Sequence, residues 1–120
     1  MQLNEGLEEL GEKEVISGDE WKGAVFAWSA IETITLPSTL KRLEYQTFWY
    51  CKNLKRIEIP NGIEYIGEEC FRDSGIEEIT LPGTLREIGE KAFRDCKNLR
   101  TVYTQEGCAV DVGKQVGYQV

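Results

Sequence analysis

The amino-acid sequence predicts an α/β repeat solenoid of about five coils, built from short parallel strands and short helical turns. The motif "TFWYCKNL" returns as "CFRDSGI" and "AFRDCKNL". Pro37, Pro60 and Pro82 lie 23 and 22 residues apart, and a phenylalanine follows each of them eleven residues later. These phenylalanines are Phe48, Phe71 and Phe93. Repeats of this length are typical of solenoids, in which equivalent residues of neighbouring coils lie one above another.

Each repeat begins with a strand and continues into a bend. In "LKRIEIP", Ile57 and Ile59 alternate with charged residues as in a strand, and the proline ends it because it has no N–H for the ladder. Gly67 and Gly89 predict a bend that needs an unusual backbone angle. The stretches "EECF" and "EKAF" are expected to form a single helical turn. The apolar columns expected in the core are Ile31, Leu54, Ile76 and Leu99; Ile34, Ile57, Ile79 and Val102; Leu36, Ile59 and Leu81; Leu40, Ile63 and Leu85; and Leu43, Ile66 and Ile88.

The repeats divide the chain into three parts. Residues 31–98 form three repeats of 22–23 residues, residues 1–30 an N-terminal cap and degenerate first repeat, and residues 99–120 a last strand and C-terminal cap. The degenerate repeat is expected to start at Leu10, which lies 21 residues before Ile31. One repeat buries too few apolar side chains to offset the entropy lost on ordering it, so stacking has to stabilise the array.

The stacked register also predicts charges that alternate in sign from coil to coil. Like charges in neighbouring strands would repel each other, and alternation avoids this. The strand face is therefore expected to be a solvated ionic surface rather than a pocket. The two charge columns are Glu32, Lys55, Glu77 and Arg100; and Lys41, Glu64 and Arg86.

Composition excludes several functions. The net charge of −7 and the pI of about 4.7 make nucleic acids and anionic lipids poor partners. The longest near-apolar run, "GAVFAWSAI", is shorter than the ~20 residues of a membrane helix, so no membrane insertion is expected. The N-terminus "MQLNEGLEEL" lacks the features of a secretion signal. The absence of histidine removes Ser-His and Cys-His nucleophiles and histidine metal sites. No catalytic residue, metal or cofactor is predicted, and the chain is not expected to be an enzyme.

The spacing of the four cysteines fits no zinc finger or ribbon. Cys51 and Cys96 share a column with Ser74 between them, so they are expected ~9–10 Å apart, too far for a disulfide. Small buried thiols are therefore expected. Cys70 occupies a column of small residues, and a contact with a cysteine of a neighbouring coil is left open. Cys108 is expected to be the most accessible.

Residues 31–98 follow the pattern L-x-x-I-x-I-P-x-x-I-x-x-I-G-x-x-x-F-x-x-C, with Glu44 in place of glycine and Ser74 in place of cysteine. This pattern resembles the BspA-like, or Treponema pallidum type, leucine-rich repeats, and the tail "VYTQEGCAVDVGKQVGYQV" resembles the closing segment of that family. The resemblance implies a right-handed leucine-rich-repeat solenoid. It also implies a bacterial cell-surface or secreted protein whose repeats bind other proteins, with no shared catalytic residues.

One repeat differs from the others after its phenylalanine. Later repeats place Arg-Asp there, whereas this one places Trp49 and Tyr50, and the preceding coil contributes Trp28. Two interpretations are open. The rings form an exposed patch that binds a partner, or residues 1–20 fold over them as a cap. The candidate contact residues are Trp28, Tyr45, Trp49, Tyr50, Arg72 and Arg94.

The expected function is binding of a protein partner, and self-association through the aromatic patch is one form of it. The alternative is a structural spacer, or a fragment of a longer repeat array, with no ligand of its own.

Overall fold

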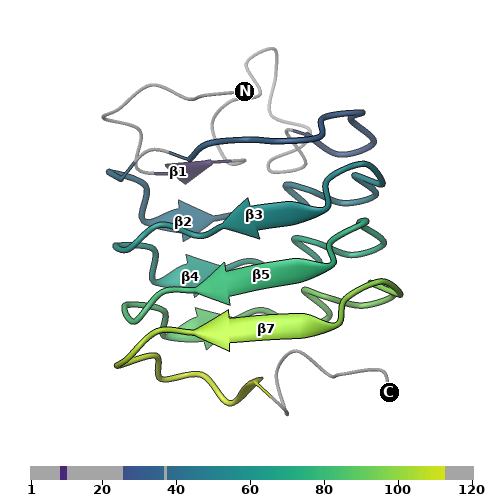
Figure 1. Ribbon diagram of the computed structural model, residues 1–120. Helices are drawn as coiled ribbons and strands as arrows, with labels where there is room; N and C mark the ends of the chain where they lie inside the picture. Colours follow the sequence, from purple (N-terminus) through teal and green to yellow (C-terminus); the bar gives the residue numbers. More distant parts are fainter. Residues whose placement is uncertain (1–8, 11–25, 37, 113–120) are drawn as a thin grey trace.

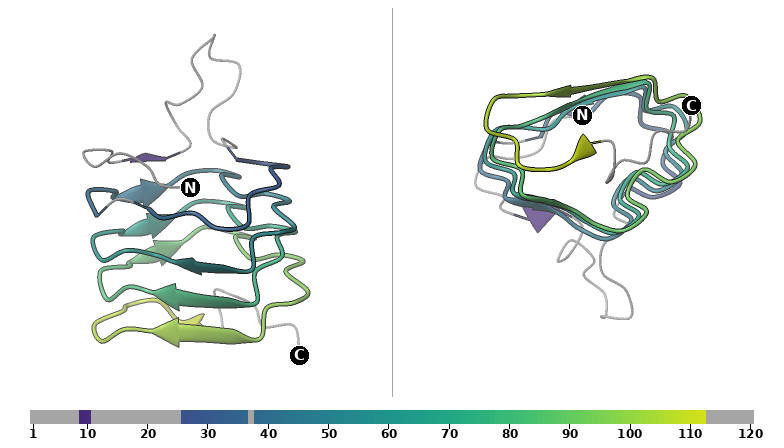
Figure 2. Two further views of the ribbon diagram at one scale, coloured as in Figure 1. Left: turned by 45° about the horizontal axis from the view of Figure 1, so that its top comes forward. Right: turned by 90° about the horizontal axis from the view of Figure 1, so that it is seen from below.

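The computed structural model describes residues 9–10, 26–36 and 38–112, and for residues 9 and 10 only the backbone. The chain winds into a right-handed stack of coils, with one strand at the front and a shorter strand at the back of the central coils (Figure 1). Seen along the stack, the coils superimpose (Figure 2). Residues 1–8 and 11–25 of the expected N-terminal cap, and residues 113–120 of the expected C-terminal cap, lie outside the described residues.

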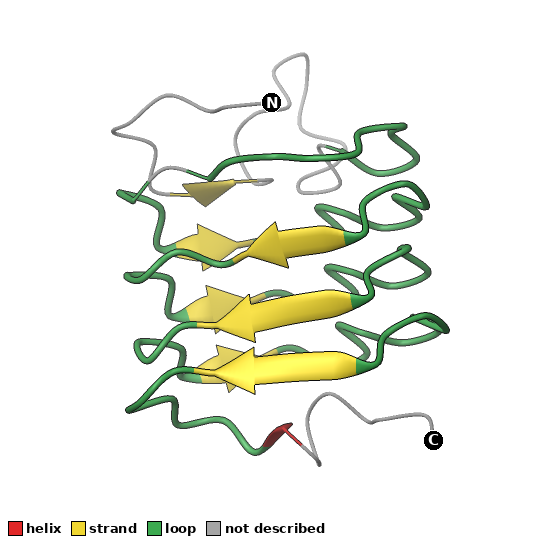
Figure 3. Ribbon diagram, viewed as in Figure 1, coloured by secondary structure: helices red, strands yellow, loops and turns green. Residues whose placement is uncertain are grey.

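The strands form two parallel sheets joined by turns and loops (Figure 3). The front sheet consists of β3 (Arg56–Glu58), β5 (Glu78–Leu81) and β7 (Thr101–Thr104). The back sheet consists of β1 (Glu9–Leu10), β2 (Arg42–Leu43), β4 (Tyr65–Ile66) and β6 (Glu87–Ile88). Every pair of neighbouring strands is parallel. The backbone N–H and C=O groups of the strands in one coil therefore form hydrogen bonds with the coils above and below it.

The strand register confirms two of the predicted apolar columns. The paired residues are Ile57, Ile79 and Val102 in the front sheet and Leu43, Ile66 and Ile88 in the back sheet. All of them are buried except Val102 of the last strand, which is half-buried. Alternation along each strand thus turns one set of side chains into the core.

The phenylalanines form a continuous stack. Ring centroids lie 5.7 Å apart for Phe26 and Phe48, 5.2 Å for Phe48 and Phe71, and 5.3 Å for Phe71 and Phe93. Neighbouring ring planes are within 7°, 10° and 8° of parallel. These spacings are close to the ~4.8 Å between strands, so the row follows the pitch of the coil. The predicted register of Phe48, Phe71 and Phe93 is confirmed.

The segments expected to be helical turns are series of hydrogen-bonded turns instead. The N–H groups of Cys70 and Arg72 donate to the carbonyls of Gly67 and Glu69, three residues earlier, at 3.2 Å each. Glu69 has a φ of 55°, and Lys91 in the next repeat has a φ of 62°. A left-handed residue interrupts a right-handed helix, so no helical turn forms at these positions. In the described part of the chain, no helix is long and apolar enough to cross a membrane.

Close packing, and not an unusual backbone angle, explains Gly67 and Gly89. Neither residue has a positive φ, so that expectation is wrong. A Cβ at Gly67 would lie 2.7 Å from the carbonyl carbon of Glu44, and a Cβ at Gly89 would lie 2.5 Å from the nitrogen of Glu68. The bend brings the backbones of neighbouring coils too close together for any side chain.

The assignment of Leu10 is also corrected. Leu10 pairs with Leu43 in the back sheet, so it does not start a repeat in the column of Ile31. Leu10 and Leu43 are 33 residues apart, more than one repeat of 22–23 residues. Counting back from Ile31 assumed a constant repeat length, which this part of the chain does not have.

Candidate functional site

The predicted contact residues lie along one edge of the solenoid. Segments 44–53, 67–75 and 89–98 follow β2, β4 and β6 and form the folded turns on one side of the stack in Figure 2. We call this surface the turn edge. The N–H of Tyr50 donates to the carbonyl of Arg72 at 2.8 Å, connecting the first of these segments to the second. Equivalent bonds connect the other levels, so the side chains of one column are held at successive heights.

Each turn segment contains two non-glycine residues with left-handed backbone. In the second of these columns, φ is 65° at Trp28, 61° at Tyr50, 59° at Asp73 and 61° at Asp95. Aspartate is enriched in this region because its short polar side chain bonds locally. A bulky residue there is an outlier, at a cost of about 1–2 kcal/mol. Trp28 and Tyr50 therefore stand where aspartate or asparagine would be more stable.

The ring of Trp28 contacts the rings of Trp49 and Tyr50, and we call these three residues the aromatic cluster. Trp28 stacks on Tyr50 with centroids 3.9 Å apart and planes at 28°. It meets Trp49 nearly edge-on, at 5.6 Å and 75°. The ammonium of Lys52, which sequence reasoning missed, lies 4.5 Å from the centroid of the Tyr50 ring, within the range of a cation–π interaction.

The three rings differ in exposure. Trp28 is 61% exposed. The cap of the second interpretation, residues 1–20, lies outside the described residues except for the backbone of residues 9 and 10, so both interpretations stay open. Trp49 and Tyr50 are half-buried. The indole N–H of Trp49 is buried and has no hydrogen-bond partner among the described residues, which is rare for a buried donor. The cluster thus exposes one large ring supported by two others.

The remaining aromatic candidate, Tyr45, stands apart from the cluster. It is 45% exposed, and among the described residues it makes no ring contact with the other three. Its position three residues before Phe48 places it on the same turn segment.

The two candidate arginines are engaged with carboxylates of their own coils. Arg72 donates to Glu69 at 2.6 Å, and its Nε lies 3.5 Å from Asp73. Burial acts to raise the pKa of Glu69, but hydrogen bonds from Gln46 and Arg72 outweigh it and lower that pKa. Arg94 lies 3.6 Å from Asp95. Both arginines are therefore paired, partly screened charges. Arg72 lies one coil beyond Tyr50, and Arg94 lies two coils beyond it.

Ion pairs form in one of the two predicted charge columns. Glu77 lies 3.9 Å from Lys55 and 3.5 Å from Arg100. No ion pair joins the residues of the second column, Lys41, Glu64 and Arg86. Alternating sign is thus compatible with stacking in both columns but produces contacts in only one.

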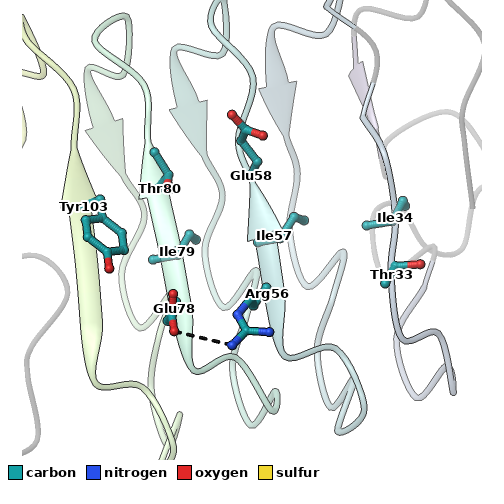
Figure 4. Close-up of a pocket in the computed structure, with 9 residues that line it drawn as sticks. All are labelled: Thr33, Ile34, Arg56, Ile57, Glu58, Glu78, Ile79, Thr80 and Tyr103. Carbon is teal, nitrogen blue, oxygen red and sulfur yellow. Dashed lines mark ion pairs between the residues drawn. The ribbon is translucent and has the colours of Figure 1, made fainter.

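A second surface feature lies on the front sheet. A broad, shallow depression of about 380 Å³ is lined by outward side chains of β3, β5 and β7, by Thr33, and by the buried Ile34, Ile57 and Ile79 (Figure 4). Arg56 and Glu78 form a 3.6 Å ion pair within it, and Tyr103, which is 54% exposed, stands on β7. The face is ionic as expected, but it is also hollowed. The alternation in "KRIEIP" is the signal that marks Arg56 and Glu58 as outward residues.

The cysteines are free thiols, and three of them are buried. The Sγ of Cys51 donates to the carbonyl of Phe26 at 3.0 Å, and that of Cys96 to the carbonyl of Phe71 at 2.9 Å. Burial raises the pKa of Cys51 to about 11, and burial also raises the pKa of Cys70 and Cys96. Cys108 is half-buried. Raised pKa values make the buried thiols poor nucleophiles.

A known protein shares this architecture. A crystal structure of a leucine-rich repeat protein from Bacteroides ovatus ATCC 8483 has a TM-score of 0.66 and 24% identity, over 89% of this chain and 28% of that one. The structure of the pneumococcal vaccine antigen PcpA has a TM-score of 0.46 and 27% identity, over 67% of this chain and 26% of that one. This chain thus spans about a quarter of each. Comparison with curated proteins gave no significant match.

The sequence itself matches a repeat family over most of its length. Residues 21–114 match the family described as "BspA type Leucine rich repeat region (6 copies)". The matched range contains both the phenylalanine stack and the turn edge. The chain therefore belongs to the BspA type leucine-rich repeat family.

Proposed function

We propose that this chain is a non-enzymatic module that binds a protein partner through its turn edge, within a bacterial cell-surface or secreted protein. The exposed ring of Trp28, stacked on Tyr50, carries the proposal. Both residues occupy left-handed positions that later coils give to aspartate. Folding alone disfavours this choice, whereas tryptophan and tyrosine contribute most of the binding energy in many interfaces. A binding role accounts for both observations.

The proposed contact surface has a centre and a rim. The aromatic cluster forms the centre, because its rings offer a large apolar area with few rotatable bonds. Tyr45, Arg72 and Arg94 form the rim. The charges of the two arginines contribute orientation and association rate more than affinity, since both arginines are already paired in the free protein.

Family membership supports this proposal. BspA type repeats are associated with bacterial surface and secreted proteins, in which they bind other proteins, and they share no catalytic residues. Burial raises the pKa of Cys51, Cys70 and Cys96, so these three thiols lack the lowered pKa of a catalytic nucleophile. The alternative is a structural spacer in a longer repeat array, in which the aromatic cluster contacts no ligand.

Affinity capture with matched variants tests the proposal. The immobilised chain, a Trp28→Ser/Tyr50→Asn variant and a Tyr103→Ser variant are presented to the same surface-protein fraction. Tyr103 is the control because it is equally an exposed aromatic, but on the front sheet. Circular dichroism and urea denaturation first establish that each variant is folded.

A partner that the parent and Tyr103→Ser chains retain, and that the cluster variant binds at least about 30-fold more weakly, would support the proposal. Equal binding by all three chains would remove the turn edge as the contact surface. Absence of any specific partner would favour the spacer alternative.

A further inference from the structure

The chain contains a single Asn-Gly pair, Asn61-Gly62, in the turn that follows Pro60. Asn61 is exposed, and Gly62 has a φ of 110°, which a residue with a side chain rarely adopts. In such a pair the main-chain nitrogen of glycine is unhindered, so it can attack the side-chain amide of the preceding asparagine. Asparagine is for this reason a chemically labile residue in exposed turns.

Thr84, from the next coil, accepts a hydrogen bond from this nitrogen. The N–H of Gly62 donates to Oγ1 of Thr84 at 2.9 Å. The hydroxyl of Thr84 in turn donates to the carbonyl of Ile63 at 2.8 Å. One side chain thus bonds to two consecutive residues of the turn, and we call this arrangement the Thr84 clasp.

We propose that Asn61 is a deamidation site whose reaction is held back by the Thr84 clasp. In the reaction, the Gly62 nitrogen loses its proton and forms a bond to Cγ of Asn61. The bond between Cγ and Nδ2 breaks, and ammonia leaves with a proton from solvent. One water molecule then opens the resulting succinimide to aspartate or isoaspartate. The balance is one amide and one water converted to one carboxylic acid and one ammonia, with no oxidation or reduction.

The clasp opposes the first step because the proton that the Gly62 nitrogen has to lose is held in a hydrogen bond to Oγ1 of Thr84. It also fixes the turn to the next coil, so the nitrogen cannot move toward Cγ without breaking a hydrogen bond. Neighbouring backbone bonds add to this: the N–H of Glu64 donates to Lys41 and that of Arg86 donates to Glu64, at 2.9 Å each.

The product would disturb the stacking of the coils. Isoaspartate lengthens the main chain by one methylene in a turn where a Cβ on Gly62 would already lie 3.4 Å from the carbonyl oxygen of Ser38. Either product adds a negative charge to the turn. Modification at Asn61 would therefore loosen the second repeat from its neighbours.

The parent chain, Thr84→Ser and Thr84→Val are incubated at 37 °C and pH 8, and the gain of mass at each asparagine is followed by peptide mass spectrometry. Thr84→Ser keeps the hydroxyl, whereas Thr84→Val keeps the shape without it. Asn53 and Asn98 are internal controls, because both are exposed and each precedes leucine. Hydrogen exchange of the Gly62 amide measures the clasp independently.

We expect the rate at Asn61 to rise about fivefold to tenfold in Thr84→Val, the factor that one hydrogen bond supplies, and to stay unchanged in Thr84→Ser. Faster exchange of the Gly62 amide in Thr84→Val would support the same conclusion. Equal rates at Asn61 in Thr84→Val and the parent would overturn the proposal. A parallel rise at Asn53 and Asn98 would do so too, because it would trace the effect to a general loss of folding.

Discussion

The ring of Trp28 lies on the ring of Tyr50 with centroids 3.9 Å apart, although both residues have a left-handed backbone. Ring stacking stabilises a protein by about 0.5–1.5 kcal/mol beyond the burial of area. The left-handed backbone costs about 1–2 kcal/mol for each of the two residues. The ring–ring attraction alone therefore does not offset the backbone cost of both residues, which distinguishes this pair from the phenylalanine stack of the core.

Replacing Tyr50 with asparagine is expected to change the free energy of unfolding by less than about 1 kcal/mol. Asparagine relieves the left-handed strain, and this gain offsets the loss of the ring contact. Urea denaturation measures the change. Phe48→Ala is the comparison, because Phe48 is fully buried and its loss should cost about 3–5 kcal/mol. A loss above about 2 kcal/mol for Tyr50→Asn would show that the ring is needed for folding.

Gly89→Ala is expected to destabilise the fold by about 3 kcal/mol. The new Cβ would lie 2.5 Å from the nitrogen of Glu68, and a backbone atom cannot move away as a flexible side chain can. Glu90→Ala, at the exposed neighbouring position, should change stability by less than about 0.5 kcal/mol. Denaturation midpoints compare the two variants, and equal midpoints would contradict the close approach of the coils.

Glu77→Lys is expected to lower the free energy of unfolding by up to about 1 kcal/mol in low salt. It places a third positive charge in the column between Lys55 and Arg100, which lie 3.9 and 3.5 Å from Glu77. Added salt should restore part of the loss. Glu64→Lys makes the same charge change where no ion pair forms, so its effect should be smaller. Identical effects of the two variants would show that contact distance does not matter.

The free energy of unfolding is expected to fall between pH 9 and pH 11. Burial raises the pKa of Cys51 from 9.0 to about 11. Below pH 9 the thiol is protonated in both states. Between the two values the unfolded chain releases the proton and the folded chain retains it, so unfolding becomes more favourable as pH rises. Cys51→Ala should show a shallower decline in urea denaturation across this range. The same slope in both proteins would contradict the assignment to Cys51.

Thiol reactivity provides the structural control for this pH dependence. In the folded chain Cys108, which is half-buried, should react with a thiol reagent before the three buried cysteines. In denaturant all four should react, since none is in a disulfide.

Several features of the fold follow from spacing alone. The constant distance from proline to phenylalanine predicts the row of Phe48, Phe71 and Phe93, and the structure confirms it. Alternation in the strands likewise places Ile57 and Ile79 in the core. The same method fails for Leu10, because the stretch before the first full repeat is not one repeat long. The method works only where the chain keeps one period.

The candidate site, too, can be predicted from the sequence only in part. Sequence reasoning picks out Trp28, Trp49 and Tyr50, because they interrupt a column that otherwise holds Arg-Asp. It does not bring in Lys52, and it leaves open whether the rings are covered. The exposure of Trp28 and its contact with Tyr50 depend on how two coils are placed in space.

The amino-acid sequence by itself determined the repeat, its register and the identity of the buried rows, because burial recurs at fixed intervals along the chain. Only the tertiary structure decided where the backbone becomes left-handed, why Gly67 and Gly89 are required, and that Thr84 reaches Gly62. The physical reason is that these features depend on backbone angles and on distances between coils, which a one-dimensional pattern of apolar and charged residues does not specify.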